Sequence, residues 1–190
     1  MARGVRREKS RLAGGIELFA ICEVVITEGK GELGVLTSAR LVKFYQNIMT
    51  DYDRMQFAYN VIKLVSKASE MVDGEDWYNV LAETLAGLDA KSINLDLIQT
   101  WFYLRYCALM GYELSLWHDI AGEKLLAEKK YRYDVSERGL YSVENGELTV
   151  DHIKLLRLIA TRSLKVLVQI GGINNIISGC LFVAREHAAI

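Results

Sequence analysis

Residues 94–110 restrict the fold most, because apolar side chains recur on nearly every side of the helix that their spacing predicts. A helix of that kind has no polar face for solvent, so other elements must surround it. Gly111 suits the position just past its end. The sequence therefore predicts the centre of a helical bundle here, with aromatic residues such as Trp101 in the core more readily than in a ligand site.

Other segments with helical spacing of apolar residues are predicted to pack around that centre. The chain contains no proline, which permits long helices. The predicted helices begin near Ala39 (capped by Thr37 or Ser38), near Asp51, near Asp76, after Thr149 (which caps it), at Ser163 and near Asn174 or Asn175. A chain with this pattern is mainly α-helical.

Two short β regions are predicted beside the helices. Residues 16–26 are rich in Ile, Val and Phe and predict a strand, and a glycine-rich turn leads into a returning strand over 32–36. Between 112 and 148 the helical pattern lapses, and short strands are predicted over 124–134 and 139–143. The predicted fold class is α+β, mainly α. Because a lone hairpin buries little apolar surface, the first one needs further strands, a partner or the helices behind it.

Composition excludes several classes of protein. No apolar run approaches the roughly 20 residues that a membrane-spanning helix needs, and the first residues lack the apolar stretch of a secretory signal. Cys22, Cys107 and Cys180 are odd in number and far apart, so neither a disulfide framework nor a zinc site is predicted. Small buried cysteines fit a reducing compartment, and we expect a cytoplasmic protein.

Motifs for catalysis are missing from the sequence. It contains no nucleophile elbow, Walker loop or dinucleotide-binding glycine motif. His118, His152 and His187 lie far from one another, and none has a partner at the spacing of a helical metal site. The sequence therefore indicates binding rather than catalysis, and an enzyme built from unrecognised residues is the alternative.

Positive charge gathers in the first twelve residues. Five cations stand there against a single acid, Glu8, whereas the whole chain carries a net charge of −1. Such a cluster neutralises phosphates and releases their counterions, so we expect DNA binding without sequence preference. A solvated terminus that binds nothing, or a solvated helix face at positions 40 and 43, would carry the same charges. The predicted DNA contacts are Arg3, Arg6, Arg7, Lys9, Arg11, Arg40 and Lys43.

The order of residue types makes this segment more specific than its charge. Ala2–Leu12 resembles the A-K-G-x-R-R-x-K-S-x-L segment of the RecO family of bacterial recombination mediators, where it lies in a DNA-binding OB domain. Leu104–Tyr112 is similar to the L-R-L-L-x-L-x-G-Y segment of that family, and the resemblance continues through the last helices. It implies a partial OB-like module over 1–36 and a helical domain over 37–190, with an insertion at about 112–148.

The sequence departs from the family pattern at two places. Family members usually begin well before the basic segment, with the first OB strands, so we expect a start at an internal Met or only part of the barrel. Many members also carry a four-cysteine zinc site that begins just after the Gly-Tyr pair. The corresponding stretch here, Leu116–Gly122, has no cysteine, so we expect no metal or other cofactor.

The resemblance implies a mediator of DNA repair rather than an enzyme, at the nucleoid and away from membranes. RecO proteins bind single- and double-stranded DNA, anneal complementary strands, and act with RecR to load RecA onto DNA covered by single-strand-binding protein. The acidic, Phe-ended tail of that protein fits a hydrophobic groove with basic flanks in some members. The residues suited to such a groove here are Trp101, Arg105, Tyr112, Trp117, Lys129 and Arg132, with Lys130 beside them. Core aromatics with scattered surface cations are one alternative, and a helical scaffold that has lost DNA binding through truncation is another.

Overall fold

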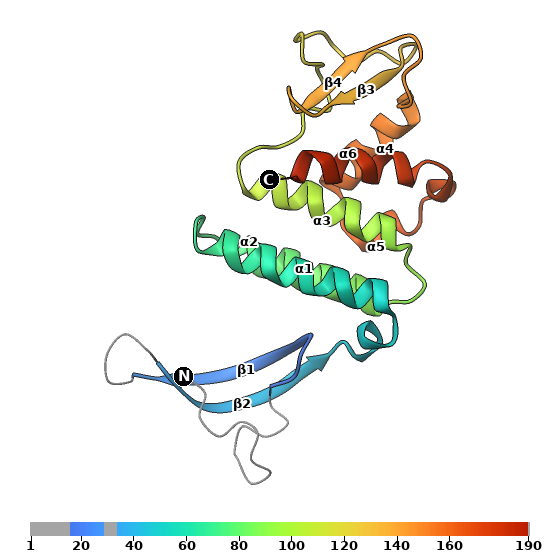
Figure 1. Cartoon of the computed structure of the whole chain (residues 1–190). Helices are drawn as coiled ribbons and strands as arrows, with labels where there is room; N and C mark the ends of the chain where they lie inside the picture. The colour runs from blue at the N-terminus through green and yellow to red at the C-terminus, as the bar shows by residue number, and fades with distance from the viewer. Residues whose placement is uncertain (1–15, 29–33, 190) are drawn as a thin grey trace.

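A computed structural model of the 190-residue chain describes residues 16–28 and 34–189. Its elements follow one another in layers: a two-stranded hairpin, then helices α1 and α2, then α3 and α6, and a second hairpin at the far end (Figure 1). The fold is mixed α+β and mainly helical, as the sequence predicts.

The first hairpin consists of β1 (Ala20–Thr27) and β2 (Val35–Phe44), which pair antiparallel along their length. The strand predicted over 16–26 is confirmed from Ala20 onward. The returning strand predicted over 32–36 is confirmed at Val35 and Leu36 but continues to Phe44, and residues 32 and 33 lie outside the described residues. At the base of the hairpin the Tyr45 amide donates to the Phe19 carbonyl at 3.0 Å, and both side chains are buried. These side chains tie the hairpin to the helices: Phe19 lies against the Tyr59 ring, with 5.1 Å between ring centres, and the Tyr45 hydroxyl donates to the Ala82 carbonyl at 3.4 Å.

The helix predicted to begin near Ala39 is wrong, because this segment continues β2 as far as Phe44. Pairing with β1 satisfies the backbone groups that face each other across the hairpin, and a helix here would leave those of β1 unpaired. Thr37 therefore does not cap a helix. Its Oγ1 instead donates to the Val25 carbonyl at 3.2 Å across the hairpin.

The next three helices follow the sequence pattern closely. A short 3-10 turn, η1 (Gln46–Thr50), leads into α1 (Tyr52–Ser69), which α2 (Asp76–Asp89) and α3 (Leu95–Leu109) follow. The Asp51 carboxylate accepts from the Arg54 amide at 3.1 Å and caps α1, while the Asn94 side chain accepts from the Asp96 amide at 2.8 Å and caps α3. These local signals place the boundaries where they are predicted.

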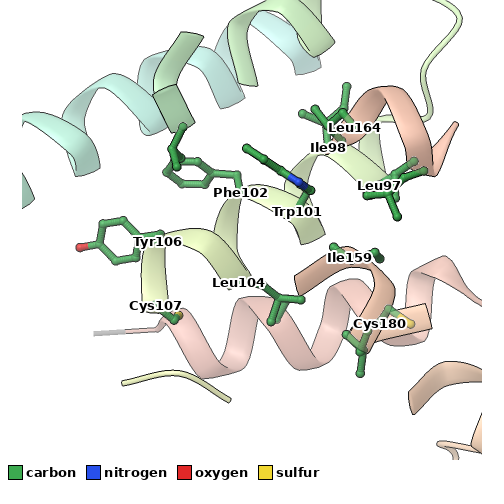
Figure 2. Packing of buried hydrophobic residues seen from close by; sticks show 14 of the residues in the cluster. Leu97, Ile98, Trp101, Phe102, Leu104, Tyr106, Cys107, Ile159, Leu164 and Cys180 are labelled. Atoms are coloured by element: carbon green, nitrogen blue, oxygen red, sulfur yellow. The ribbon is translucent and has the colours of Figure 1, made fainter. Parts of the chain in front are cut away.

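The core is built around α3, as the apolar residues on nearly every side of this helix predict. Figure 2 shows α3 side chains packed against residues from neighbouring elements on several sides. Phe102, Cys107 and Ile98 are fully buried, and Trp101 is nearly so. Figure 1 shows α6 (Ile177–Ala188) alongside α3, and α2 contributes to the core from the other side.

Arg54 joins α1 to the loop between α2 and α3. Arg54 is only 6% exposed. Its Nε lies 3.5 Å from an oxygen of the Asp51 carboxylate, and its guanidinium donates to five backbone carbonyls. These belong to Gly87, Leu88, Ala90, Lys91 and Ile93, with 3.0 Å to the Leu88 oxygen. Because a buried cation must be fully paired, this arrangement fixes the loop path and the start of α3.

The C-terminal half contains three more helices. Thr149 caps α4 (Val150–Thr161) in a reciprocal arrangement with His152, as its position predicts. The segment predicted to continue from Ser163 forms only the short α5 (Leu164–Leu167). Gly172, with φ of +79°, then turns the chain through η2 (Ile173–Asn175) into α6.

The insertion contains the second hairpin, β3 (Tyr131–Asp134) and β4 (Gly139–Ser142). Short strands are confirmed here, although the first begins later than residue 124. Tyr131 and Leu140 are fully buried, so side-chain packing holds this region. The division into domains at residues 36 and 37 stays a prediction.

Candidate nucleic-acid interface and partner groove

Two of the predicted DNA contacts lie on β2. Arg40 pairs with Glu23 of β1, with 2.9 Å from Arg40 Nε to Glu23 Oε2, and both side chains are well exposed. Lys43 holds its ammonium 4.7 Å from the centre of the Tyr45 ring. An exposed ion pair contributes little to stability, so Arg40 can exchange Glu23 for a phosphate at small cost.

A β-bulge places these two cations on the same face of the hairpin. Arg40 lies opposite Glu23 and Lys43 lies opposite Ile21, with Val42 as the additional residue of β2. Residues two apart on a strand share a face, and directly paired residues share it too. Simple alternation along β2 would have separated Arg40 from Lys43. The remaining predicted contacts (Arg3, Arg6, Arg7, Lys9 and Arg11) lie outside the described residues.

Trp101 and Arg105 come together on α3, as the predicted groove requires. The Trp101 indole N–H donates to the Arg162 carbonyl at 2.8 Å, and Arg105 Nη2 donates to the same oxygen at 3.1 Å. The guanidinium lies 5.4 Å from the Trp101 ring centre. Both residues line a cavity of about 320 Å³, which Val80, Leu109 and Glu83 also border.

Arg105 carries a donor that the described part of the chain does not use. Its Nε is buried and has no hydrogen-bond partner among residues 16–28 and 34–189. The pKa of Arg105 is lowered from its ordinary value. Burial is the largest cause, and the carboxylates of Glu83 and Glu113 oppose the shift without cancelling it. A buried, unpaired donor is costly, so this N–H group is suited to donate a hydrogen bond to an anionic group of a ligand.

Tyr112 lies in a different environment, beside α6 and the insertion. The Arg138 guanidinium lies 4.7 Å from the centre of its ring, and the His187 ring centre is 6.1 Å away. Burial raises the pKa of Tyr112 to about 12, with Cys107 and Tyr106 acting in the same direction. Tyr112 therefore belongs to a packed network rather than to the wall of the Trp101 cavity.

Trp117 forms a second aromatic and cationic pair, with Arg157 of α4. Trp117 is 64% exposed, and the Arg157 guanidinium lies 3.8 Å from its ring centre. Arg157 Nε and Nη2 both donate to the Leu116 carbonyl, at 2.9 and 2.8 Å. The pair borders a separate cavity of about 400 Å³. Sequence reasoning missed Arg157, because α4 and the Trp117 segment are far apart in the chain.

The last two predicted groove residues lie on the insertion. Lys129 is exposed, and Arg132 of β3 donates to the Asn145 carbonyl at 3.4 Å and lies 3.9 Å from a Glu147 oxygen. The structure thus brings Trp101 and Arg105 into one cavity, while Tyr112, Trp117 and Arg132 contact other partners.

Residues 16–28 and 34–189 contain no group of three or more His, Cys, Asp or Glu that could hold a metal ion. Burial raises the pKa of Cys107 and of Cys180 to about 12, so both remain thiols at neutral pH. Within the same part of the chain, no helix combines the length and apolar character that crossing a membrane demands.

Comparison with known proteins identifies the family. Residues 49–172 match the family described as Recombination protein O C terminal, so this part of the chain is a recombination-protein domain. The chain belongs to the RecO family.

Three curated relatives show how far the similarity extends. The DNA repair protein RecO of a Roseiflexus species is 29% identical over 134 residues, which are 70% of this chain and 47% of that protein. RecO of Desulfatibacillum aliphaticivorans is 29% identical over 119 residues (61% and 46%), and RecO of Dehalococcoides mccartyi is 27% identical over 167 residues (83% and 64%). The chain spans about half the length of the first two relatives.

Proposed function

We propose that this chain is a DNA-binding recombination mediator of DNA repair, which anneals single strands and assists RecA loading onto DNA covered by single-strand-binding protein. Membership of the RecO family carries this proposal. The shared face of Arg40 and Lys43 supports it, because two cations on one exposed strand can contact successive phosphates. The protein acts by binding and not by turnover, in the cytoplasm at the nucleoid.

We also propose RecR and the acidic tail of single-strand-binding protein as partners. The cavity beside Trp101 and Arg105 is the favoured tail site, because it combines an aromatic wall with a buried, unpaired guanidinium donor. A carboxylate would satisfy Arg105 Nε, and Leu109 and Val80 would contact an apolar side chain. Trp117 and Arg157 also offer an aromatic ring and a guanidinium at the second cavity, but Arg157 Nε and Nη2 already donate to the Leu116 carbonyl.

DNA binding is tested by the anisotropy of a labelled oligo(dT) strand over a series of salt concentrations. Affinity should fall steeply as the salt concentration rises. Arg40→Gln should weaken binding about threefold, and it should reduce the salt slope (the steepness of log affinity against log salt concentration) by about 0.7. Glu23→Gln is the matched control: it frees Arg40 from its carboxylate, so it should strengthen binding. The double change Arg6→Ala, Arg7→Ala should lower affinity and salt slope further.

Loss of DNA binding would favour the alternative of a helical protein-interaction scaffold. If the wild-type chain does not bind oligo(dT) even at about 50 mM salt, DNA binding is excluded for this chain. A labelled acidic, Phe-ended peptide then tests the scaffold. Arg105→Gln should weaken the peptide complex and Arg157→Gln should not, if the Trp101 cavity is the receptor; the opposite result assigns the tail to Trp117.

A further inference from the structure

We propose that a groove between α2 and α5 is a second contact for a bound DNA strand, in which Lys43 and Lys165 hold the phosphates. This inference rests on the proposed function. We call the site the α5 groove; it has a volume of about 660 Å³. Its lining consists of Lys43, Ala82, Glu83, Ala86, Gly87, Ala90, Ile93, Ser163, Leu164 and Lys165.

The floor of the α5 groove is made of small side chains from one side of α2. Ala82, Ala86 and Ala90 repeat every four residues, which places them in one row along the helix. Gly87 lies beside them, and a Cβ atom there would approach Leu164 Cδ1 to 2.8 Å. Leu164 therefore covers Gly87, and the alanine methyl groups form the accessible floor. This floor lets a sugar–phosphate backbone lie close to α2, within reach of the lysines at its edges.

The two lysines reach the groove from different parts of the chain. Lys43 is at the end of β2, above the buried Tyr45 ring, and Lys165 is exposed on α5. The one carboxylate in the lining, Glu83, accepts from the Leu164 amide at 2.6 Å. This hydrogen bond holds the start of α5. Because two lysines stand against this single carboxylate, the lining has a net positive charge.

The position of Lys43 favours a nucleic acid over an acidic peptide as the occupant. The bulge at Val42 puts Lys43 on the face that carries Arg40, so cations continue from the hairpin into the groove. A phosphate backbone has charges at regular intervals and can follow such a path from β2 to α5. Lys165 is the residue that extends the DNA contact onto the helical body.

The test compares three single lysine-to-glutamine variants of the full chain. Lys165→Gln and Lys43→Gln each remove one charge from the groove, and Lys63→Gln removes one from an exposed position on α1 outside it. Binding of labelled oligo(dT) is measured by anisotropy as salt increases. Each groove variant should bind about threefold more weakly and lose about 0.7 from the salt slope, while Lys63→Gln should match the wild type.

Each result supports or overturns the inference. If the wild type binds oligo(dT) and both groove variants behave as Lys63→Gln does, the α5 groove does not contact DNA, and the proposed function still stands. If the variants lose affinity for a labelled polyglutamate peptide but keep full affinity for DNA, the groove is a peptide site. If the wild type does not bind DNA at all, the proposed function fails and the inference fails with it. All three side chains are exposed, so the substitutions should leave folding intact. Equal thermal unfolding curves for the wild type and the variants will show this.

Discussion

The imidazole of His187 accepts a hydrogen bond from Tyr133, across 2.9 Å between Nδ1 and the phenol oxygen. The direction follows from the other ring nitrogen. His187 Nε2 lies 2.8 Å from the Tyr112 carbonyl, which can only accept, so Nε2 carries the hydrogen. Burial raises the pKa of Tyr133 to about 12, so its hydroxyl is a donor at neutral pH. A neutral histidine therefore links α6 to both the start and the hairpin of the insertion.

Folding stability should fall as the solution becomes acidic. Burial lowers the pKa of His187; the Tyr112 carbonyl opposes this shift and Arg138 adds to it. In the unfolded chain the imidazole titrates near about 6.5, so below that pH the unfolded state binds more protons than the folded state. The free energy of unfolding should then decrease with pH from about 6.5 down to the folded pKa.

Urea unfolding of the wild type and of His187→Gln between about pH 7.5 and pH 5 measures this dependence. The wild type should lose more stability on acidification than the variant. His152, whose pKa burial also lowers, is present in both proteins and cancels in the comparison. Equal losses in the two proteins would exclude His187 as the source.

Removing the Tyr133 hydroxyl should also destabilise the fold. Tyr133→Phe leaves His187 Nδ1 buried without its donor, and a loss of about 1–2 kcal/mol is expected. Tyr141→Phe is the control, since Tyr141 lies on the adjacent strand and is only partly buried. Urea unfolding should separate the two variants. If Tyr141→Phe costs as much as Tyr133→Phe, the hydrogen bond to His187 is not responsible.

Arg54 should not tolerate replacement by lysine. A lysine ammonium has three donors at one point and cannot span the five carbonyls that the guanidinium contacts. Arg54→Lys should therefore cost about 2–4 kcal/mol of unfolding free energy. Arg40→Lys, at an exposed ion pair, should change it by less than about 0.5 kcal/mol. Similar midpoints for both variants in urea would contradict this assignment.

Gly146 should be required for the turn that closes the insertion. A Cβ atom at this position would lie 2.5 Å from the Tyr131 nitrogen and 2.6 Å from its oxygen. Those two atoms exchange hydrogen bonds with Leu148, at 2.9 Å each. Gly146→Ala should force that backbone apart at a cost of about 2–3 kcal/mol. Gly74→Ala, where a Cβ meets nothing within 4 Å, should be nearly neutral in thermal unfolding, and a comparable loss there would refute the steric argument.

Features encoded by neighbouring residues could be predicted from the sequence. Asp51 and Thr149 cap helices where expected. The apolar residues on nearly every side of the helix predicted over 94–110 identify the central helix. The strand at Ala39–Phe44 was missed because its pairing with β1 is decided by a partner distant in sequence, while its own residues also fit helical spacing.

The candidate sites were harder to predict, for the same reason. Trp101 and Arg105 are one helical turn apart, so their proximity follows from the sequence. Arg157 stacks on Trp117 from another helix, and Lys43 turns toward the α5 groove only because Val42 is an additional residue in β2. Contacts of that kind depend on tertiary packing and on register, which spacing alone does not reveal.

The Arg54 arrangement works as a crown ether does around potassium: a ring of backbone oxygens encloses one cation. The acceptors that residues 87–93 supply are all peptide carbonyls, so the side chains of that segment take no part in holding the cation. The Asp51 carboxylate, 3.5 Å from Arg54 Nε, is the further acceptor and comes from the start of α1. Replacing the exposed side chains of Lys91 and Ser92 therefore removes no acceptor, whereas replacing Arg54 leaves several buried carbonyls without a donor.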